Sequence, residues 1–381
     1  MKRCAFSAAL AAVFCVLFLG AVRAEGELNV SARAAVLIDG ATGRALYALN
    51  ADKRYPMAST TKIMTALLAL ERCDLSETVT ASANASGVPG TSIYLGEGEQ
   101  LSMKDMLLGL MLRSGNDAAV AIAEHVSGSV EAFARLMNAR AAALGADANF
   151  VTPNGLDAPG HGATARAMAL IAREALKNED FREIVSTQRA VIPWRDSEYS
   201  RVLVNKNRLL KEYEGATGVK TGFTTPAGRC LVFSARRDGM ELIGVVMNCG
   251  GWFDEAERML DWGFACYSPA AALAAGQACG QVRVAGGFAS SVGVRAQDEL
   301  AAALCEADQW RVELALADSA QAPVRRGDRL GTASLIVNGE TLAQTALLAD
   351  ADVEKLDFAA ALRRAAARWP LAIPGKTVNI Q

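Results

Sequence analysis

The chain has 381 residues, of which 51% are hydrophobic and 21% are charged, and its formal net charge is −2. This length allows a large core and more than one domain, and the balance of residue types is that of a globular protein. The near-neutral charge lacks the basic excess on which nucleic-acid binding depends, so we expect no nucleic-acid partner.

The first 24 residues have the pattern of a signal peptide. Lys2 and Arg3 precede a long apolar stretch, and Val22-Arg23-Ala24 supplies the small residues that a signal peptidase needs. We expect cleavage after Ala24 and export of the rest of the chain to the periplasm or the outer face of the cytoplasmic membrane. An uncleaved membrane anchor is the alternative, because the apolar stretch is nearly long enough to span a bilayer.

Strands and helices alternate in blocks along the next part of the chain. Residues 34–39 and 44–49 flank the turn GATGR and predict a β-hairpin. Residues 62–71, KIMTALLALE, predict a helix whose apolar side chains point in every direction, so other helices should enclose it. Residues 103–175 predict a mainly helical region, which the loop at 152–162 interrupts.

From about residue 217 the pattern becomes that of strands. Two are predicted at 230–235 and 240–249, and residues 254–267 predict a helix that closes this region. Strands at both ends with helices between them predict an antiparallel sheet covered by helices, which is an α/β or α+β layered domain. We expect this domain to occupy residues 25–270.

The composition shifts after residue 270. Residues 270–280 are rich in alanine and glycine and predict a linker, and residues 280–353 predict a small all-β domain. Its short alternating strands are expected at 281–288, 310–318 and 332–339.

Residues 354–381 predict an amphipathic helical tail. Phe358, Leu362 and Trp369 share one face of this helix, and most of its arginines lie on the other. Two interpretations remain open: contact of residues 354–369 with an anionic membrane surface, or docking of the helix on the β domain.

Cysteine and histidine usage gives little material for a metal site. The six cysteines beyond residue 24 contain no C-x-x-C pair, and we expect mostly buried thiols without assigning a disulfide. The chain has only two histidines, His125 and His161, so a Ser-His-Asp relay is not expected. Acid–base chemistry must then depend on lysine, carboxylate or tyrosine. We expect no metal and no cofactor.

Ser59 and Lys62 stand at the start of the apolar helix. At this spacing both side chains point into the same space, and free N–H groups at a helix start favour developing negative charge. A serine is activated when a base takes its proton, and a buried lysine near a second cation is neutral enough to be that base. By itself the pair is better explained as a helix N-cap serine with a solvated lysine.

Two later triplets change that interpretation. Ser114-Gly115-Asn116 lies on a tight loop between two helices, and Lys220-Thr221-Gly222 precedes the strand near Cys230. Together, S-x-x-K, S-x-N and K-T-G in this order are the signature of penicillin-recognising serine enzymes, with S-G-N here in place of the usual S-D-N.

The chain resembles the low-molecular-mass penicillin-binding proteins that are D-alanyl-D-alanine carboxypeptidases. The resemblance extends beyond the triplets to residues 34–71, to VTPNGLDAPGHGATAR at 151–166, to NKNRLLKEYEGATGVKTGFTTPAGRCLVFSA at 205–235, and to APVRRGDRLGTASLIVNGETLA at 322–343. It implies the penicillin-recognising fold, a small C-terminal β domain and a role in peptidoglycan biosynthesis and cell shape. The implied partners are stem peptides ending in D-Ala-D-Ala, with β-lactam antibiotics as covalent inhibitors.

The resemblance also implies a role for each catalytic residue. Ser59 would attack the substrate and carry the acyl group, and Lys62 would accept its proton. Ser114 would relay a proton to the leaving amine, and Asn116 would hold the substrate's peptide carbonyl.

The substrate-binding residues follow in the same way. Lys220 would keep Lys62 neutral and, with Thr221 of the Lys220-Thr221-Gly222 triplet, bind the terminal carboxylate, which Lys206 would assist. The backbone N–H groups of Ser59 and Phe223 would form the oxyanion hole. Trp252 and Phe253 stand where members of this family often have a basic residue, so the carboxylate-binding set rests on these lysines and Thr221.

Two alternatives remain. A β-lactamase shares the motifs, but the E-x-x-x-N pattern at Glu174 to Asn178 lies at a helix end well after Ser114, and a β domain is foreign to single-domain β-lactamases. A catalytically idle peptidoglycan-binding scaffold would have lost a catalytic member, and here all are present.

Overall fold

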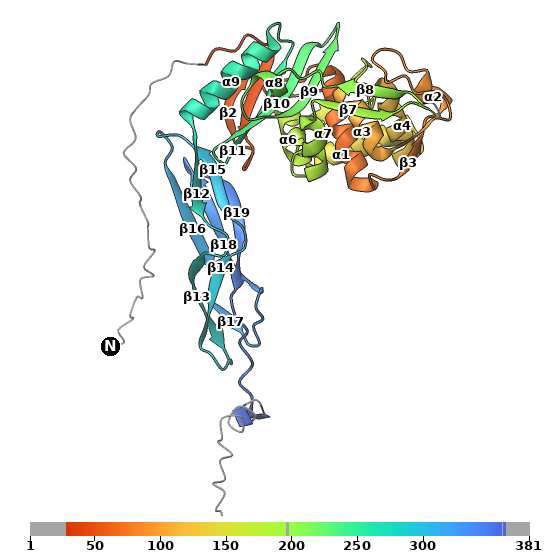
Figure 1. The fold of residues 1–381 in the computed structure, drawn as a ribbon. Coiled ribbons are helices and arrows are strands. Elements are labelled where there is room, and N and C mark those ends of the chain that lie inside the picture. The colour runs from red at the N-terminus through yellow and green to blue at the C-terminus, as the bar shows by residue number, and fades with distance from the viewer. Residues whose placement is uncertain (1–27, 196–197, 360, 363–381) are drawn as a thin grey trace, which may run out of the picture. The chain divides into compact units, whose positions relative to one another are not determined.

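The computed structural model describes residues 28–195, 198–359 and 361–362. They fall into two compact units, which are described separately (Figure 1). The first contains the chain up to Pro269 together with Ala303–Glu306, and the second contains Ala270–Ala302 and the residues from Ala307 onward. The predicted signal peptide lies outside the described residues.

A five-stranded antiparallel sheet forms the centre of the first unit, in the order β2-β1-β11-β10-β9. Its strands are β1 (Ala34–Asp39), β2 (Ala45–Leu49), β9 (Ala216–Thr224), β10 (Gly228–Arg237) and β11 (Met240–Met247). The predicted hairpin and the two predicted later strands are therefore confirmed. The sheet brings the first strands of the chain beside strands some 200 residues later, since Ala34 pairs with Met247.

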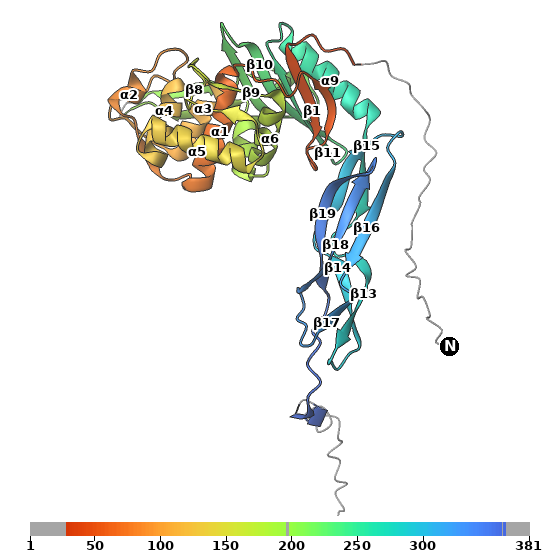
Figure 2. The same cartoon turned by 180° about the vertical axis from the view of Figure 1, so that it is seen from behind.

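The two faces of this sheet bury different side chains. Because residues alternate between faces, Val36 and Ile38 pack with the helical region, whereas Leu37 and Phe233 pack with α9 (Trp252–Cys266). Figures 1 and 2 show α9 on one face and α6 on the other. This layering confirms the predicted fold class.

The predicted helical region is also confirmed. Within the predicted range 103–175 lie α3 (Met103–Leu112), α4 (Asn116–Ser127), α5 (Val130–Ala143) and α6 (Ala165–Ala175). The first unit also contains η1 (Ala58–Thr61), α1 (Lys62–Arg72), α2 (Ala83–Ser86), α7 (Glu179–Ser186) and α8 (Leu209–Glu212). Every residue of α1 from Lys62 to Ala69 is buried, as expected for a helix that is apolar on all sides. Three short strand pairs border the helices: β3 (Thr78–Thr80) with β4 (Gln100–Ser102), β5 (Ala148–Asn149) with β6 (Gly162–Ala163), and β7 (Arg189–Pro193) with β8 (Ser200–Val204).

The second unit is built on a six-stranded sheet in the order β16-β18-β19-β14-β13-β17. Its strands are β13 (Ala278–Ala285), β14 (Ser291–Ala296), β16 (Trp310–Leu316), β17 (Ser319–Gln321), β18 (Arg329–Val337) and β19 (Glu340–Ala349), and β12 (Ser268–Leu273) and β15 (Leu300–Leu304) form a separate pair.

The linker predicted at 270–280 is wrong in part. Residues 268–273 form β12, and β13 begins at Ala278. Small residues such as alanine have low strand propensity by themselves, and it is pairing with a neighbouring strand that makes them strand here.

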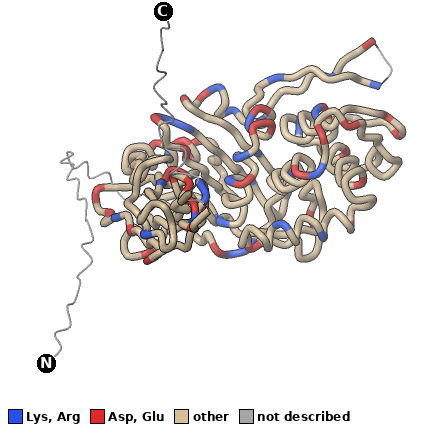
Figure 3. The backbone as a smooth tube through the Cα atoms, turned by 90° about the horizontal axis from the view of Figure 1, so that it is seen from below, with Lys and Arg blue, Asp and Glu red and all other residues tan. Residues whose placement is uncertain are grey.

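Only the beginning of the predicted helical tail is described. Phe358, Ala359, Ala361 and Leu362 are helical, and the side chains of Phe358 and Leu362 are exposed; Trp369 and the arginines of the tail lie outside the described residues. Figure 3 shows Lys and Arg interspersed with Asp and Glu over the described parts of the chain. None of the helices in the described part of the chain is long and apolar enough to cross a membrane.

Candidate active site

Ser59 lies in the short 3-10 helix η1 immediately before α1, and Lys62 is the first residue of α1. In a 3-10 helix residues i and i+3 lie directly above one another, and Lys62 Nζ is 3.0 Å from Ser59 Oγ. Ala58, just before the serine, has a φ of 48°, which turns the chain sharply into this helix. The predicted proximity of Ser59 and Lys62 is confirmed, with a tighter helix than expected.

The amine of Lys62 is buried and has three hydrogen-bonding neighbours. Besides Ser59 Oγ, it donates to Asn116 Oδ1 at 2.8 Å and to the backbone carbonyl of Asn154 at 2.5 Å. The three neighbours come from η1, from the start of α4 and from the loop at 152–162. The amine therefore joins three segments that lie far apart in the sequence.

Burial lowers the pKa of Lys62 well below its ordinary value of 10.5. The positive charges of Lys220 and Lys206 lower this pKa further, and Asp117 opposes them. A neutral amine has two N–H bonds and one lone pair. Because the two carbonyl oxygens can only accept, both N–H bonds go to Asn116 and Asn154, and the lone pair is left facing the hydroxyl of Ser59.

The loop of Ser114 and Asn116 presents both residues to the interior. Ser114 has a φ of 65°, and its Oγ is buried with no hydrogen-bond partner among the described residues. Asn116 donates from Nδ2 to the carbonyl of Pro89 at 2.7 Å, while its Oδ1 faces Lys62. An amide nitrogen has two N–H bonds, so one of them remains for a ligand.

Strand β9 carries Lys220, Thr221 and Gly222 alongside Ser59. A Cβ atom placed on Gly222 would lie 2.9 Å from the backbone nitrogen of Ser59 and 3.0 Å from that of Thr60. Only glycine allows the strand to approach η1 this closely. The next residue, Phe223, keeps its ring largely exposed, so its place at the site is a backbone one.

Lys220 of this strand is one of three cations, with Lys206 and Arg113, that lie close enough to affect a neighbour's pKa. Lys220 is buried and donates to the carbonyl of Thr221 at 2.8 Å; burial, with a contribution from Lys206, lowers its pKa to about 7. Partial burial and the charge of Arg113 lower the pKa of Lys206. This concentration of positive charge favours an anionic ligand.

Three contributors to the site were missed by the sequence analysis. Asn154 contributes its backbone carbonyl, which accepts a hydrogen bond from Lys62 and which a motif of side chains does not reveal. Gly155, with a φ of +83°, leaves room for η1, since a Cβ there would lie 1.9 Å from the carbonyl oxygen of Ala58. Asp117 is buried and accepts from Ser92 Oγ and from the N–H groups of Ile93 and Leu95, which ties the loop before α3 to the start of α4. An acidic residue in the first turn of a helix was the available signal for Asp117.

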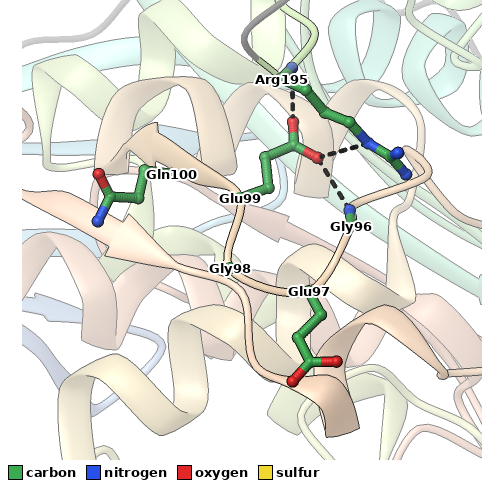
Figure 4. A pocket seen from close by; sticks show the side chains of 6 residues that line it. All are labelled: Gly96, Glu97, Gly98, Glu99, Gln100 and Arg195. Carbon is green, nitrogen blue, oxygen red and sulfur yellow. Dashed lines mark hydrogen bonds and ion pairs between the residues drawn. The ribbon is translucent and has the colours of Figure 1, made fainter.

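A second buried carboxylate near this loop, Glu99, has a structural role. Figure 4 shows it beside Gly96 and Arg195, and it accepts from the N–H of Gly96 at 2.9 Å and that of Arg195 at 3.1 Å. The guanidinium of Arg201 binds both of its oxygens, at 2.6 and 2.9 Å. Burial raises the pKa of Glu99, but these hydrogen bonds lower it by more, so the group stays ionised and is not a general acid.

Glu174 and Asn178 also have structural roles, as the sequence suggested. Glu174, in the last turn of α6, pairs with Arg140 and Lys177. The side chain of Asn178 caps α7 by accepting from the N–H of Phe181. These contacts with neighbouring side chains and backbone do not form a pair that activates water.

Family comparisons cover nearly the whole chain. A sequence model described as D-alanyl-D-alanine carboxypeptidase matches residues 21–251, and one described as the C-terminal domain of penicillin-binding protein 5 matches residues 267–355.

Individual relatives support the same family assignment. The D-alanyl-D-alanine carboxypeptidase DacF of Bacillus subtilis is 35% identical over 90% of this chain and 91% of its own. The crystal structure of penicillin-binding protein 5 from Haemophilus influenzae superposes with a TM-score of 0.72 at 31% identity, covering 87% of this chain and all of its own. The D-alanyl-D-alanine carboxypeptidase of Mycobacterium tuberculosis, with a TM-score of 0.60 at 33% identity, covers 62% of this chain but 92% of its own.

Proposed function

The chain belongs to the D-alanyl-D-alanine carboxypeptidase family, and we propose that it removes the terminal D-alanine of peptidoglycan stem pentapeptides through an acyl-enzyme at Ser59. It is a serine-type carboxypeptidase of cell-wall metabolism that binds penicillin. The observation that carries the mechanism is the buried amine of Lys62, which lies 3.0 Å from Ser59 Oγ and also contacts the carbonyl oxygens of Asn116 and Asn154.

Acylation follows from this arrangement. Ser59 Oγ attacks the carbonyl carbon of the penultimate D-alanine while its proton moves to Lys62. The negative oxygen that develops is held by the backbone N–H groups of Ser59 and Phe223, each contributing about 3–4 kcal/mol to transition-state stabilisation. Ser114, whose buried Oγ has no hydrogen-bond partner among the described residues, takes the proton from Lys62 as it donates its own to the departing amine. Free D-alanine leaves, and Lys62 is neutral again.

Deacylation and substrate binding use the same groups. Water attacks the ester at Ser59, with Lys62 accepting the water's proton and returning one to Ser59 Oγ. The terminal carboxylate of the substrate is bound by Lys220 and Thr221, with Lys206 adding positive charge, and Asn116 donates its remaining N–H to the peptide carbonyl. A β-lactam acylates Ser59 in the same way and blocks the enzyme.

The test is direct release of D-alanine from a synthetic pentapeptide, with labelling by a fluorescent penicillin. We expect wild type to release D-alanine and to be labelled with slow loss of the label, and Ser59→Ala to do neither. Rapid hydrolysis of the penicillin without D-alanine release would instead identify a β-lactamase. No labelling and no release would identify a scaffold.

The location of the enzyme is part of the proposal. We infer that residues 1–24 direct export and are removed after Ala24, so that the enzyme acts outside the cytoplasm, where its substrate lies. Edman sequencing of protein purified from the cell envelope should begin at Glu25. A mature chain that begins at Met1 would show an uncleaved anchor.

The tail and the domain limits complete the proposal. We propose a catalytic domain over 25–270, a β domain over 280–353 and a membrane-contacting tail over 354–381; exposed Phe358 and Leu362 support the last. Mature protein should co-sediment with anionic liposomes, and protein lacking residues 354–381 should not. Equal pelleting would mean that the tail is docked elsewhere.

A further inference from the structure

Three side chains with metal-binding atoms meet at the end of α1 that is opposite to Lys62. They are Cys73, which caps the C-terminus of α1, Glu77 in the turn that follows, and His125 in the last turn of α4. One ligand atom from each lies within 4.8 Å of the other two, and His125 Nε2 is 3.0 Å from Glu77 Oε2. It is the one such group of three found in the part of the chain that the structure describes.

The carboxylate of Glu77 is held in place by its own turn. Its Oε1 accepts from the backbone N–H of Asp74 at 2.7 Å, and its backbone N–H donates to the carbonyl of Asp74 at 3.0 Å. Its carbonyl accepts from the N–H of Met103 at 2.8 Å, which fixes the turn to the start of α3. One carboxylate oxygen is therefore anchored, and the other is directed toward His125, as outer hydrogen bonds do for metal ligands.

We propose that Cys73, Glu77 and His125 bind one Zn²⁺ ion, with water as the fourth ligand. Thiolate, imidazole and carboxylate are the ligands that zinc takes in proteins, at about 2.3 Å for sulfur and 2.0–2.2 Å for nitrogen and oxygen. In a tetrahedron these bonds place nitrogen and oxygen roughly 3.3 Å apart, and sulfur and nitrogen roughly 3.6 Å apart. The 3.0 Å between His125 Nε2 and Glu77 Oε2 is close to the first of these values, and the sulfur of Cys73 lies within 4.8 Å of both atoms. On binding, the Cys73 thiol releases its proton to solvent.

The position of this site assigns it a structural role. Lys62 is the first residue of α1 and Cys73 follows its last, so about 16 Å of helix separate the zinc site from the catalytic amine. In the same way, Asn116 begins α4 and His125 lies near its end. The ion joins the far ends of two packed helices whose first residues, Lys62 and Asn116, are hydrogen-bonded to each other. Zinc should therefore stabilise the fold with little effect on D-alanine release.

The experiment uses full-length protein freed of metal by dialysis against a chelator, with Co²⁺ as the spectroscopic probe. Wild type should develop thiolate-to-cobalt charge-transfer absorption that saturates at one ion per chain and is abolished by one equivalent of Zn²⁺. Cys73→Ser should lose this absorption, and His125→Ala should bind Co²⁺ at least about tenfold more weakly. Cys305→Ser, which removes a thiol outside the cluster, is the matched control and should behave as wild type.

Thermal unfolding supplies a second readout. Zn²⁺ should raise the melting temperature of wild type and of Cys305→Ser but not that of Cys73→Ser, and labelling by fluorescent penicillin checks that each variant is folded. The proposal is overturned if wild type shows no thiolate-to-cobalt absorption, or if Cys73→Ser retains it. In the first case Glu77 and His125 form an ion pair and nothing more.

Discussion

At the scale of single residues, the site is unusual in having two buried lysine side chains. Lys62 and Lys220 are both buried, and burial lowers the pKa of each. In the proposed mechanism a lowered pKa helps Lys62, which must be neutral to accept a proton. It opposes the proposed role of Lys220, which must be charged to bind a carboxylate. The pH dependence of activity should therefore come from these two lysines. Burial lowers the pKa of His161 to about 4, so its imidazole is uncharged near neutral pH.

Replacing Lys62 by arginine tests the role of the neutral amine. In Lys62→Arg the guanidinium can still donate to Asn116 and Asn154 but cannot accept the proton of Ser59 at any working pH. We expect labelling by fluorescent penicillin to slow by about 10²–10⁴-fold, while Lys104→Arg, an exposed lysine replaced in the same way, labels normally. Labelling of Lys62→Arg at the wild-type rate would show that another group is the base.

The charge of Lys220 predicts the alkaline limit of activity. Because folding lowers the pKa of Lys220 to about 7, the free enzyme loses this cation as the pH rises through that value, and kcat/KM for the pentapeptide should fall. On the acid side, kcat/KM should fall when Lys62 becomes protonated, giving a bell-shaped profile. Lys220→Arg keeps its charge and should retain kcat/KM to higher pH. If both proteins lose activity over the same alkaline range, Lys220 does not set this limit.

At the scale of elements, the site depends on how closely strand β9 approaches the 3-10 helix η1. In the K-T-G triplet the lysine and threonine contribute side chains, whereas the glycine contributes because it lacks one and lets the backbone come close to η1. The backbone of Gly222 passes so near the nitrogens of Ser59 and Thr60 that any side chain would displace η1. Gly155 makes a second close approach from the loop at 152–162, so η1 is confined from two directions.

Substitution of Gly222 tests this confinement. In Gly222→Ala the new methyl group would overlap the Ser59 nitrogen, so η1 must move and the oxyanion N–H of Ser59 moves with it. We expect penicillin labelling to slow by about 10²-fold or more and the protein to lose about 1–3 kcal/mol of stability, measured by urea unfolding. Gly250→Ala, at a position with open space around it, should change neither. Normal labelling of Gly222→Ala would contradict the close approach.

At the scale of the whole molecule, every residue proposed for catalysis or binding belongs to the first compact unit. The Mycobacterium tuberculosis carboxypeptidase matches this chain over 62% of its length while using 92% of its own. A relative of about the size of one unit thus exists as a separate protein. We therefore expect the first unit to build the catalytic geometry without the β domain.

A chain ending at Pro269 tests this division of labour. We expect it to be labelled by fluorescent penicillin and to release D-alanine from a soluble pentapeptide at an undiminished rate, because no proposed site residue is removed. Its melting temperature, compared with that of the full chain by scanning calorimetry, reports what the second unit adds. A folded but unlabelled fragment would show that the β domain takes part in the chemistry.

Much of this protein can be predicted from local sequence. Strand alternation identified the hairpin at 34–49 and the strands near 235 and 245, and the run after Lys62 identified a buried helix, because these patterns record which face of each element meets the core. The order of the three motifs indicated the chemistry around Ser59. The prediction of a linker at 270–280 was wrong in part, because pairing with a neighbouring strand, and not composition, decides whether small residues form a strand.

Contacts between distant segments were decided by the tertiary structure alone. The carbonyl of Asn154 beside Lys62, the approach of Gly222 to Ser59, and the meeting of Cys73 and Glu77 with His125 have no spacing that a motif search detects. The physical reason is that periodicity records the neighbours of a residue along one helix or strand. Which carbonyl faces a buried amine, and which thiol faces an imidazole, is set only when the elements pack.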